Sequence, residues 1–203
     1  MSSDTDIANV AMRLLKANRI ASLTDGSNNA NKAVDIFSEI RDSLLRSHNW
    51  NFATKRQKLA RSATAPTYEF DYAYPLPSDW LRTIAVHDND AGSGIVLYRE
   101  EEVAGQGAII TSSEDIWIRY VYRVTDPNRM SADFRMAFSY VLAVALPGIS
   151  NLSADREDRL EGRANAKLRM AKHSDAIAAT PERRPAGSWV GVRSGYPGRA
   201  WPD

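Results

Sequence analysis

The stretch Ser47-His48-Asn49-Trp50-Asn51-Phe52-Ala53-Thr54-Lys55-Arg56 is the point at which the periodicity of the chain changes. Before it, from about Ala30 to Ser47, apolar residues recur at the spacing of a helix face. After it, apolar and polar residues alternate, which is typical of strands that bury one face. Helical spacing returns after Asp126-Pro127-Asn128. The stretch therefore marks the first boundary between a helical part and a β part.

Four segments have the apolar spacing of helices. They cover about Thr5 to Asn18, Ala30 to Ser47, Ala132 to Leu146 and Ser153 to Ala178. Ser3 or Asp4 can cap the first, and Ser131 can cap the third. The third is apolar around most of its circumference, which predicts a central position among the helices. The fourth has only a thin apolar stripe, at Leu160, Ala164, Leu168 and Ala171.

The β part is expected to hold several short strands. In the first, the apolar positions Tyr68, Phe70, Tyr72 and Tyr74 alternate with other residues. Pro75 and Pro77 are expected to end it, because proline cannot donate a ladder hydrogen bond. Further strands are expected at Leu81–His87, Ile95–Arg99, Ala108–Ser112 and Asp115–Val124.

This order of elements predicts an α+β fold, in which a small antiparallel β domain is inserted between helices 2 and 3 of a four-helix bundle. Residues 1–50 and 126–180 would form the bundle, and residues 51–125 the β domain. Residues 181–203 are rich in Pro and Gly without periodicity, which predicts an extended C-terminal tail.

Composition argues against several classes of function. Lys and Arg number 26 and Asp and Glu 25, so there is no strong positive field for binding DNA of any sequence. The chain has no cysteine, which removes disulfides and thiolate chemistry. His48, His87 and His173 are too far apart to form a metal pair on one helix. We therefore expect no metal, no cofactor and no catalytic residue. No signal peptide and no membrane span are expected either.

Two rival functions remain open. Glu100, Glu101, Glu102 and Asp115 are the only plausible acids for a peptidoglycan hydrolase, although three consecutive glutamates more often form a solvated loop. The strip from Asn51 to Lys58, followed by Arg61, mixes aromatic and basic residues as a DNA-binding module would.

Two stretches resemble a known family. One comprises Ser22-Leu23-Thr24-Asp25-Gly26-Ser27 and the residues from Ile40 to Arg56 that end in Trp-Asn-Phe-Ala-Thr-Lys-Arg. The other is Tyr72-Ala73-Tyr74-Pro75-Leu76-Pro77-Ser78-Asp79-Trp80-Leu81-Arg82. Together they are similar to the tail tubular protein A, or head-to-tail adaptor, family of short-tailed bacteriophages and prophages. The resemblance extends loosely over about residues 5 to 178.

The resemblance implies a structural virion protein that is not an enzyme. Such a protein is made in the host cytoplasm and forms a dodecameric ring with copies of itself at the junction of head and tail. One face of the ring docks on the portal protein and the other receives the tail nozzle. Genomic DNA passes through the lumen without sequence-specific binding. No cofactor is implied.

Candidate contact residues follow from surface chemistry. The fourth helix carries charges of both signs, and its inter-subunit candidates are Asp155, Arg156, Arg159 and Arg163. The tail has tryptophan, tyrosine and arginine, the residues that dominate binding hot spots. Its portal-contact candidates are Arg183, Arg184, Trp189, Arg193, Tyr196, Arg199 and Trp201. The tail is expected to be flexible in the free subunit and to become ordered on the portal.

Overall fold

The computed structural model describes residues 2–92, 94, 96–146, 148–149 and 152–178. The tail, with all seven portal-contact candidates, lies outside these residues. The described helices are α1 (Asp4–Leu14), α2 (Asn28–Arg46), α3 (Ala132–Ala145) and α4 (Ala154–Ala178), with single 3₁₀ turns η1 (Asn51–Ala53) and η2 (Pro127–Arg129). The strands are β1 (Thr54–Lys58), β2 (Tyr72–Pro75), β3 (Trp80–His87), β4 (Arg99–Val103), β5 (Gln106–Thr111) and β6 (Trp117–Tyr122).

Serine caps begin three of these helices. The Ser3 hydroxyl accepts from the Asp6 amide while the Asp6 carboxylate accepts from the Ser3 amide, which completes a capping box. Ser27 and Ser131 accept in the same way from the amides of Ala30 and Phe134. The caps predicted at Ser3 and Ser131 are confirmed, and α2 begins two residues earlier than expected.

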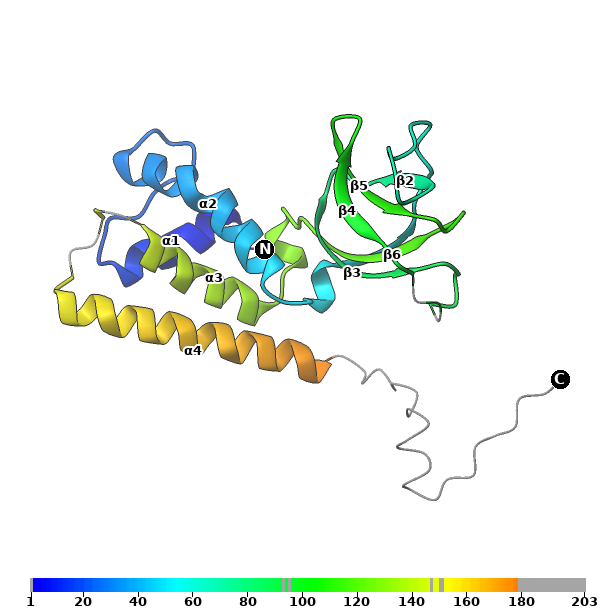
Figure 1. The fold of residues 1–203 in the computed structure, drawn as a ribbon. Coiled ribbons are helices and arrows are strands. Elements are labelled where there is room, and N and C mark those ends of the chain that lie inside the picture. The colour runs from blue at the N-terminus through cyan, green and yellow to red at the C-terminus, as the bar shows by residue number, and fades with distance from the viewer. Residues whose placement is uncertain (1, 93, 95, 147, 150–151, 179–203) are drawn as a thin grey trace, which may run out of the picture.

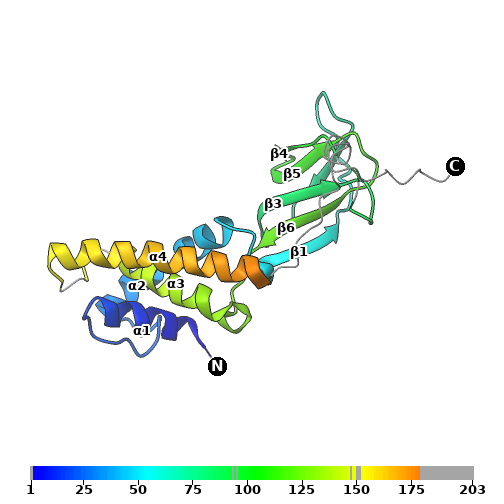
Figure 2. The same ribbon diagram turned by 90° about the horizontal axis from the view of Figure 1, so that it is seen from below.

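The predicted architecture, a four-helix bundle with an inserted β domain, is wrong, although the α+β class is right. Helix α3 is the hub: α4 and α1 pack on it most extensively, and α2 packs on it less. α2 also packs on β3 and β6, so its apolar face is shared between a helix and a sheet. In a four-helix bundle each helix packs along its neighbours around a common core, whereas α1, α2 and α4 each pack on α3 and hardly on one another. Figures 1 and 2 show the helices at one end of the molecule and the strands at the other.

The strands form two antiparallel sheets of three, ordered β1-β6-β3 and β2-β5-β4. Chain neighbours β3 and β4 belong to different sheets, so the turn after His87 does not close a hairpin. One apolar cluster runs from α1 (Ile7) through α3 (Phe134) into both sheets (Ile118 and Ile109). Helices and sheets therefore share the main core, and a smaller separate cluster of Phe70, Ala73, Ala108 and Ile110 lies on the β2-β5-β4 sheet.

The strand predictions failed at three places, one of which is β1, a strand that none of them covered. Residues 67–71 do not form a strand, because the backbone at Glu69 is left-handed (φ 71°), and Tyr68 is 77% exposed. The strand predicted at Ile95–Arg99 begins at Arg99 instead, so Glu100, Glu101 and Glu102 lie in β4 and not in a loop. β4 is an edge strand, where charged side chains discourage pairing with another chain. Among the described helices, none is both long and apolar enough to cross a membrane.

Candidate functional site: the joint between helices and sheets

Residues 47–56 run from the end of α2 through η1 into the first residues of β1. We call this segment the joint, and Trp50 is its centre. The indole of Trp50 is fully buried and donates a hydrogen bond of 2.9 Å to the Leu44 carbonyl. Its ring meets Phe134 of α3 edge-on at 4.9 Å and Phe52 at 5.9 Å between centroids. Trp50 therefore lies between helices and strands, where packed rings restrict the angle between these elements.

The last turns of α4 close over the joint. The Asp175 carboxylate accepts from the Asn51 amide at 3.1 and 3.2 Å, and the Asn51 side chain donates to the Asp175 carbonyl at 2.7 Å. Lys172 donates to the Ser47 carbonyl at 3.3 Å. Asp175 thus supplies acceptors to a 3₁₀ turn whose preceding residue, Trp50, has no side-chain cap.

His48 completes this contact, with its Nε2 atom 3.5 Å from Oδ2 of Asp175. Burial raises the pKa of Asp175, although the Asn51 hydrogen bond and His48 oppose that effect. Burial also lowers the pKa of His48, against the opposing attraction of Asp175. Burial thus opposes the charged form of both side chains, and their mutual attraction opposes that effect.

The structure brings together the two sequence stretches that carry the family resemblance. Lys55 of the joint lies 2.5 Å from the Asp79 carboxylate, and Arg82 donates to the Asn49 side chain. Lys55 also stands 4.0 Å above the Tyr122 ring, a cation–π contact. The segment after the two prolines is thereby attached to the end of α2 and the start of β1.

Asp79 is the acceptor at the middle of this network. Tyr120 donates to Oδ1 of Asp79 at 3.1 Å, and the Arg123 amide donates to the Asp79 carbonyl at 2.7 Å. Burial and then the Asp79 charge raise the pKa of Tyr120 to about 12, so its hydroxyl remains a donor. The Asp79 side chain accepts from Lys55 and Tyr120. It joins β1, β6 and the start of β3.

Arg123, which directly follows β6, ties the sheet to Asp42 of α2. Arg123 donates to the Asp42 carboxylate at 2.7 Å, and the largely buried Arg41 holds the other Asp42 oxygen at 3.1 Å. The chemistry of the joint is therefore hydrogen bonding and ring packing between elements, which fixes their geometry.

The acids proposed for hydrolysis are not gathered in a closed cleft. Glu101 and Glu102 line a hollow of about 210 Å³ with Glu69 and Tyr68, and all four residues are exposed. A general acid for glycoside cleavage needs apolar surroundings that keep it protonated. Asp115 instead pairs with Lys58 at 2.8 Å. Among the residues that the structure describes, no group of three or more His, Asp or Glu is placed to hold a metal ion.

Most cations of the possible DNA-binding strip are engaged within the chain. Lys55 is paired with Asp79 and Lys58 with Asp115, while Arg61 stands 4.6 Å above the Tyr72 ring. Only cations that are free to exchange counterions contribute fully to phosphate binding. The strip therefore has fewer free cations for the phosphates of a DNA backbone than its sequence suggests.

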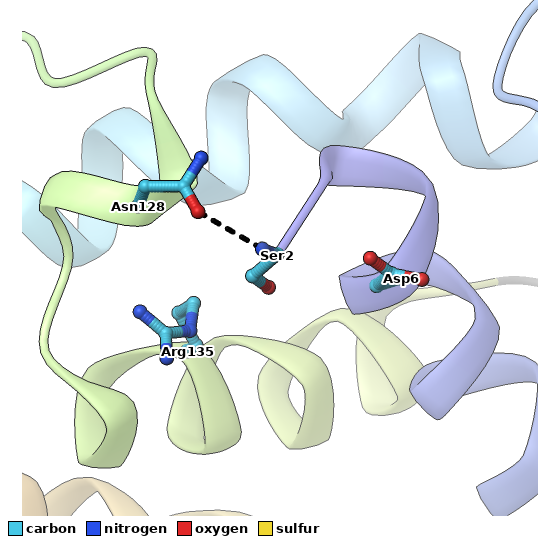
Figure 3. A pocket seen from close by; sticks show the side chains of 4 residues that line it. All are labelled: Ser2, Asp6, Asn128 and Arg135. Carbon is cyan, nitrogen blue, oxygen red and sulfur yellow. Dashed lines mark hydrogen bonds between the residues drawn. The ribbon is translucent and has the colours of Figure 1, made fainter.

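Two further hollows lie beside α1. In the first, of about 690 Å³, the Ser2 amide donates to the Asn128 side chain at 2.9 Å, and Asp6 and Arg135 line the walls (Figure 3). Arg135 already donates to the carbonyls of Pro127 and Met130, so it supports η2. The second, of about 580 Å³, is lined by Arg13, Lys16 and Arg19 together with Asp6. Of these cations, Arg13 lies in the last turn of α1, where it offsets the helix dipole.

Sequence reasoning identified Trp50 and Phe52 but missed Asp175, because no local pattern links it to Asn51. It also missed Asn9, which is buried and bonds both the amide and the carbonyl of Ile20, at 2.9 and 3.0 Å. The inter-subunit candidates Asp155, Arg156, Arg159 and Arg163 are all exposed on α4.

Comparison with known proteins adds no identity. No family model matches the chain. No curated protein matches it significantly.

Proposed function

We propose that this protein is a structural component of a short-tailed bacteriophage virion, the head-to-tail adaptor. Twelve copies form a ring between the portal protein and the tail nozzle, and genomic DNA passes through its lumen. The protein is made in the host cytoplasm and resides at the head–tail junction. It carries out no catalysis.

The observation that carries the proposal is the contact between the two family-like stretches. Their polar residues meet as Lys55 with Asp79 and Asn49 with Arg82, and Trp50 fills the space behind them. These residues hold helices and sheets at a fixed angle. A subunit that transmits load between a capsid and a tail needs such a joint, whereas an enzyme needs a cleft with free chemical groups.

The direct test is assembly on the portal. The purified protein is mixed with the portal protein encoded in the same genome and imaged by electron microscopy. We expect a ring of added density beneath the portal, with one adaptor for each portal subunit. A portal that remains bare at saturating adaptor would contradict the proposal.

We further propose that the tail supplies the grip on the portal. The chain from Pro181 to Asp203 is to be removed in one variant, and Trp189 and Trp201 changed to alanine in a second. Tyr68→Ala serves as the control, because it removes an exposed aromatic outside the tail. Both tail variants should lose portal binding while the control retains it. Full affinity of the truncated chain would assign the grip to another surface.

The two rival functions have distinct signatures. Glu101→Gln with Glu102→Gln should leave any cell-wall activity of the preparation unchanged, because the proposal gives these acids no catalytic role. If a cell-wall activity is present and these changes abolish it, the hydrolase is favoured. A DNA-binding module would show affinity that falls steeply as salt rises.

A further inference from the structure

Helix α4 has a surface that its own subunit does not use. Over 25 residues it buries only Leu160, Ala164 and Ala171, and it packs chiefly on α3. Figures 1 and 2 show it along one border of the helical layer, with its remaining sides away from the other helices. A helix with so little burial relies on its surface charges or on a partner for much of its stability.

The surface charges of α4 are arranged against the stability of a lone helix. Neighbours at i,i+3 and i,i+4 stabilise a solvated helix when their signs differ and destabilise it when they agree. Opposite signs occur only at Asp155 with Arg159 and at Lys172 with Asp175. Like signs occur at Asp155 with Asp158, Arg156 with Arg159, Glu157 with Glu161, Asp158 with Glu161, Arg159 with Arg163, Arg163 with Lys167, and Arg169 with Lys172.

The like charges form two rows on opposite flanks. At about 100° per residue, the basic row (Arg156, Arg159, Arg163, Lys167) runs along one side of the buried line through Leu160, Ala164 and Ala171. The acidic row (Glu157, Asp158, Glu161) runs along the other side, and Asp155 lies on the outward crest between them. Within the described part of the chain, neither row forms an ion pair closer than 4.0 Å.

An apolar segment continues the basic row toward the C-terminal end of α4. Met170, Ser174 and Ile177 follow Lys167 at helical spacing, and Met170 and Ile177 are 62% and 69% exposed. Exposed apolar side chains in line with a charged row are typical of a contact surface with another protein.

We propose that this surface binds a second copy of the chain, with the basic row of one α4 against the acidic row of the next. The two rows are complementary in charge, and they lie on opposite flanks of the same helix. A two-fold contact through one flank would set like charges against each other, so the contact is head-to-tail and can close a ring. The proposal says how the inter-subunit candidates on α4 would meet, and it rests on the proposed function only in placing this contact in a virion ring.

Cysteine crosslinking tests the geometry, because the natural sequence has no cysteine. Ser174→Cys adds a thiol on the flank of the basic row, and Ala176→Cys adds one on the opposite flank; both positions are exposed. The purified double variant, at high protein concentration and low salt, is treated with a short bis-maleimide. We expect a ladder of multimers from the double variant and only monomer from each single variant.

Charge reversal in the same double-cysteine background tests the partner. Arg159→Glu with Arg163→Glu places acidic residues in the middle of the basic row, and Asp158→Lys with Glu161→Lys places basic residues in the acidic row. Each should reduce the ladder about tenfold, because attractive pairs become repulsive. An equimolar mixture of the two should restore it, since acidic flanks then face basic flanks. Asp35→Lys with Glu39→Lys, an exposed pair on α2, is the control and should leave the ladder intact.

Three outcomes would overturn the inference: no ladder from the double variant, dimers from a single-cysteine variant, or a ladder that survives reversal of the basic row. Circular dichroism of every variant establishes that the fold is retained. No portal is needed, so failure to form the ladder and failure to dock on a portal are separate results.

Discussion

Replacement of Trp50 by alanine measures how much the joint contributes to stability. Trp50 is fully buried, and truncation of a buried tryptophan costs about 3–5 kcal/mol. The lost indole hydrogen bond adds little, because the Leu44 carbonyl keeps two donors, the amide of Ser47 at 3.2 Å and its hydroxyl at 2.8 Å. At about 2–4 °C per kcal/mol for a chain of this length, the melting temperature should fall by about 6–20 °C.

Urea unfolding followed by circular dichroism gives the free energy of unfolding of each variant. Trp50→Phe keeps an aromatic ring against Phe134 and should cost only about 1–2 kcal/mol. Tyr68→Ala is the control and should change stability by less than about 0.5 kcal/mol, because its side chain is exposed. If Trp50→Ala costs less than about 1 kcal/mol, the cost of an average substitution, the joint does not hold the helices and sheets together.

Three further changes test neighbouring contacts. Asn9→Leu removes both partners of the Ile20 backbone and should lower the free energy of unfolding in urea by about 2–6 kcal/mol, since each buried group left unpaired costs about 1–3. A loss no larger than that of Asn29→Ala, which removes one hydrogen bond of a partly exposed side chain, would contradict this. Burial lowers the pKa of His48, so the unfolded chain binds a proton there before the folded chain does, and the free energy of unfolding should fall as pH drops below about 6.5. Urea unfolding at about pH 7.5 and about pH 5.5 should show a smaller fall for His48→Gln than for the natural chain, and equal falls would refute the assignment. A double-mutant cycle with Lys55→Met and Asp79→Asn should give a coupling free energy of only about 0.2–1 kcal/mol, because the Lys55 side chain is 42% exposed. A coupling free energy above about 3 kcal/mol would contradict this, because it would mean that the pair is shielded from water.

The helices were predictable because their signals are local. Ser3 and Ser131 cap the helices that they precede, and the largely apolar circumference of the 132–146 segment indicated its central place. The arrangement of the four helices was not predictable in the same way. A bundle was the simplest expectation, but α2 divides its apolar face between α3 and the sheets, and that choice depends on contacts distant in sequence.

The β part and the joint show the same division between local and distant information. Alternation at 67–71 indicated a strand, yet the left-handed backbone at Glu69 ends it, and nothing in the side-chain pattern reveals that conformation. The position of Trp50 between helices and strands followed from the change of period. Its partner elements did not, since Asp175 is 124 residues from Asn51 and Lys55 is 24 residues from Asp79.

The central position of α3 sets the order in which a growing chain can fold during translation. α1 and α2 end 118 and 86 residues before the start of α3, the helix on which both of them pack. β1 likewise has to wait for β6, because Thr54 pairs with Val121. Until the ribosome has released α3, Ile7, Phe37 and Trp50 cannot complete the core that they share with it, so contacts distant in sequence should make folding late and slow.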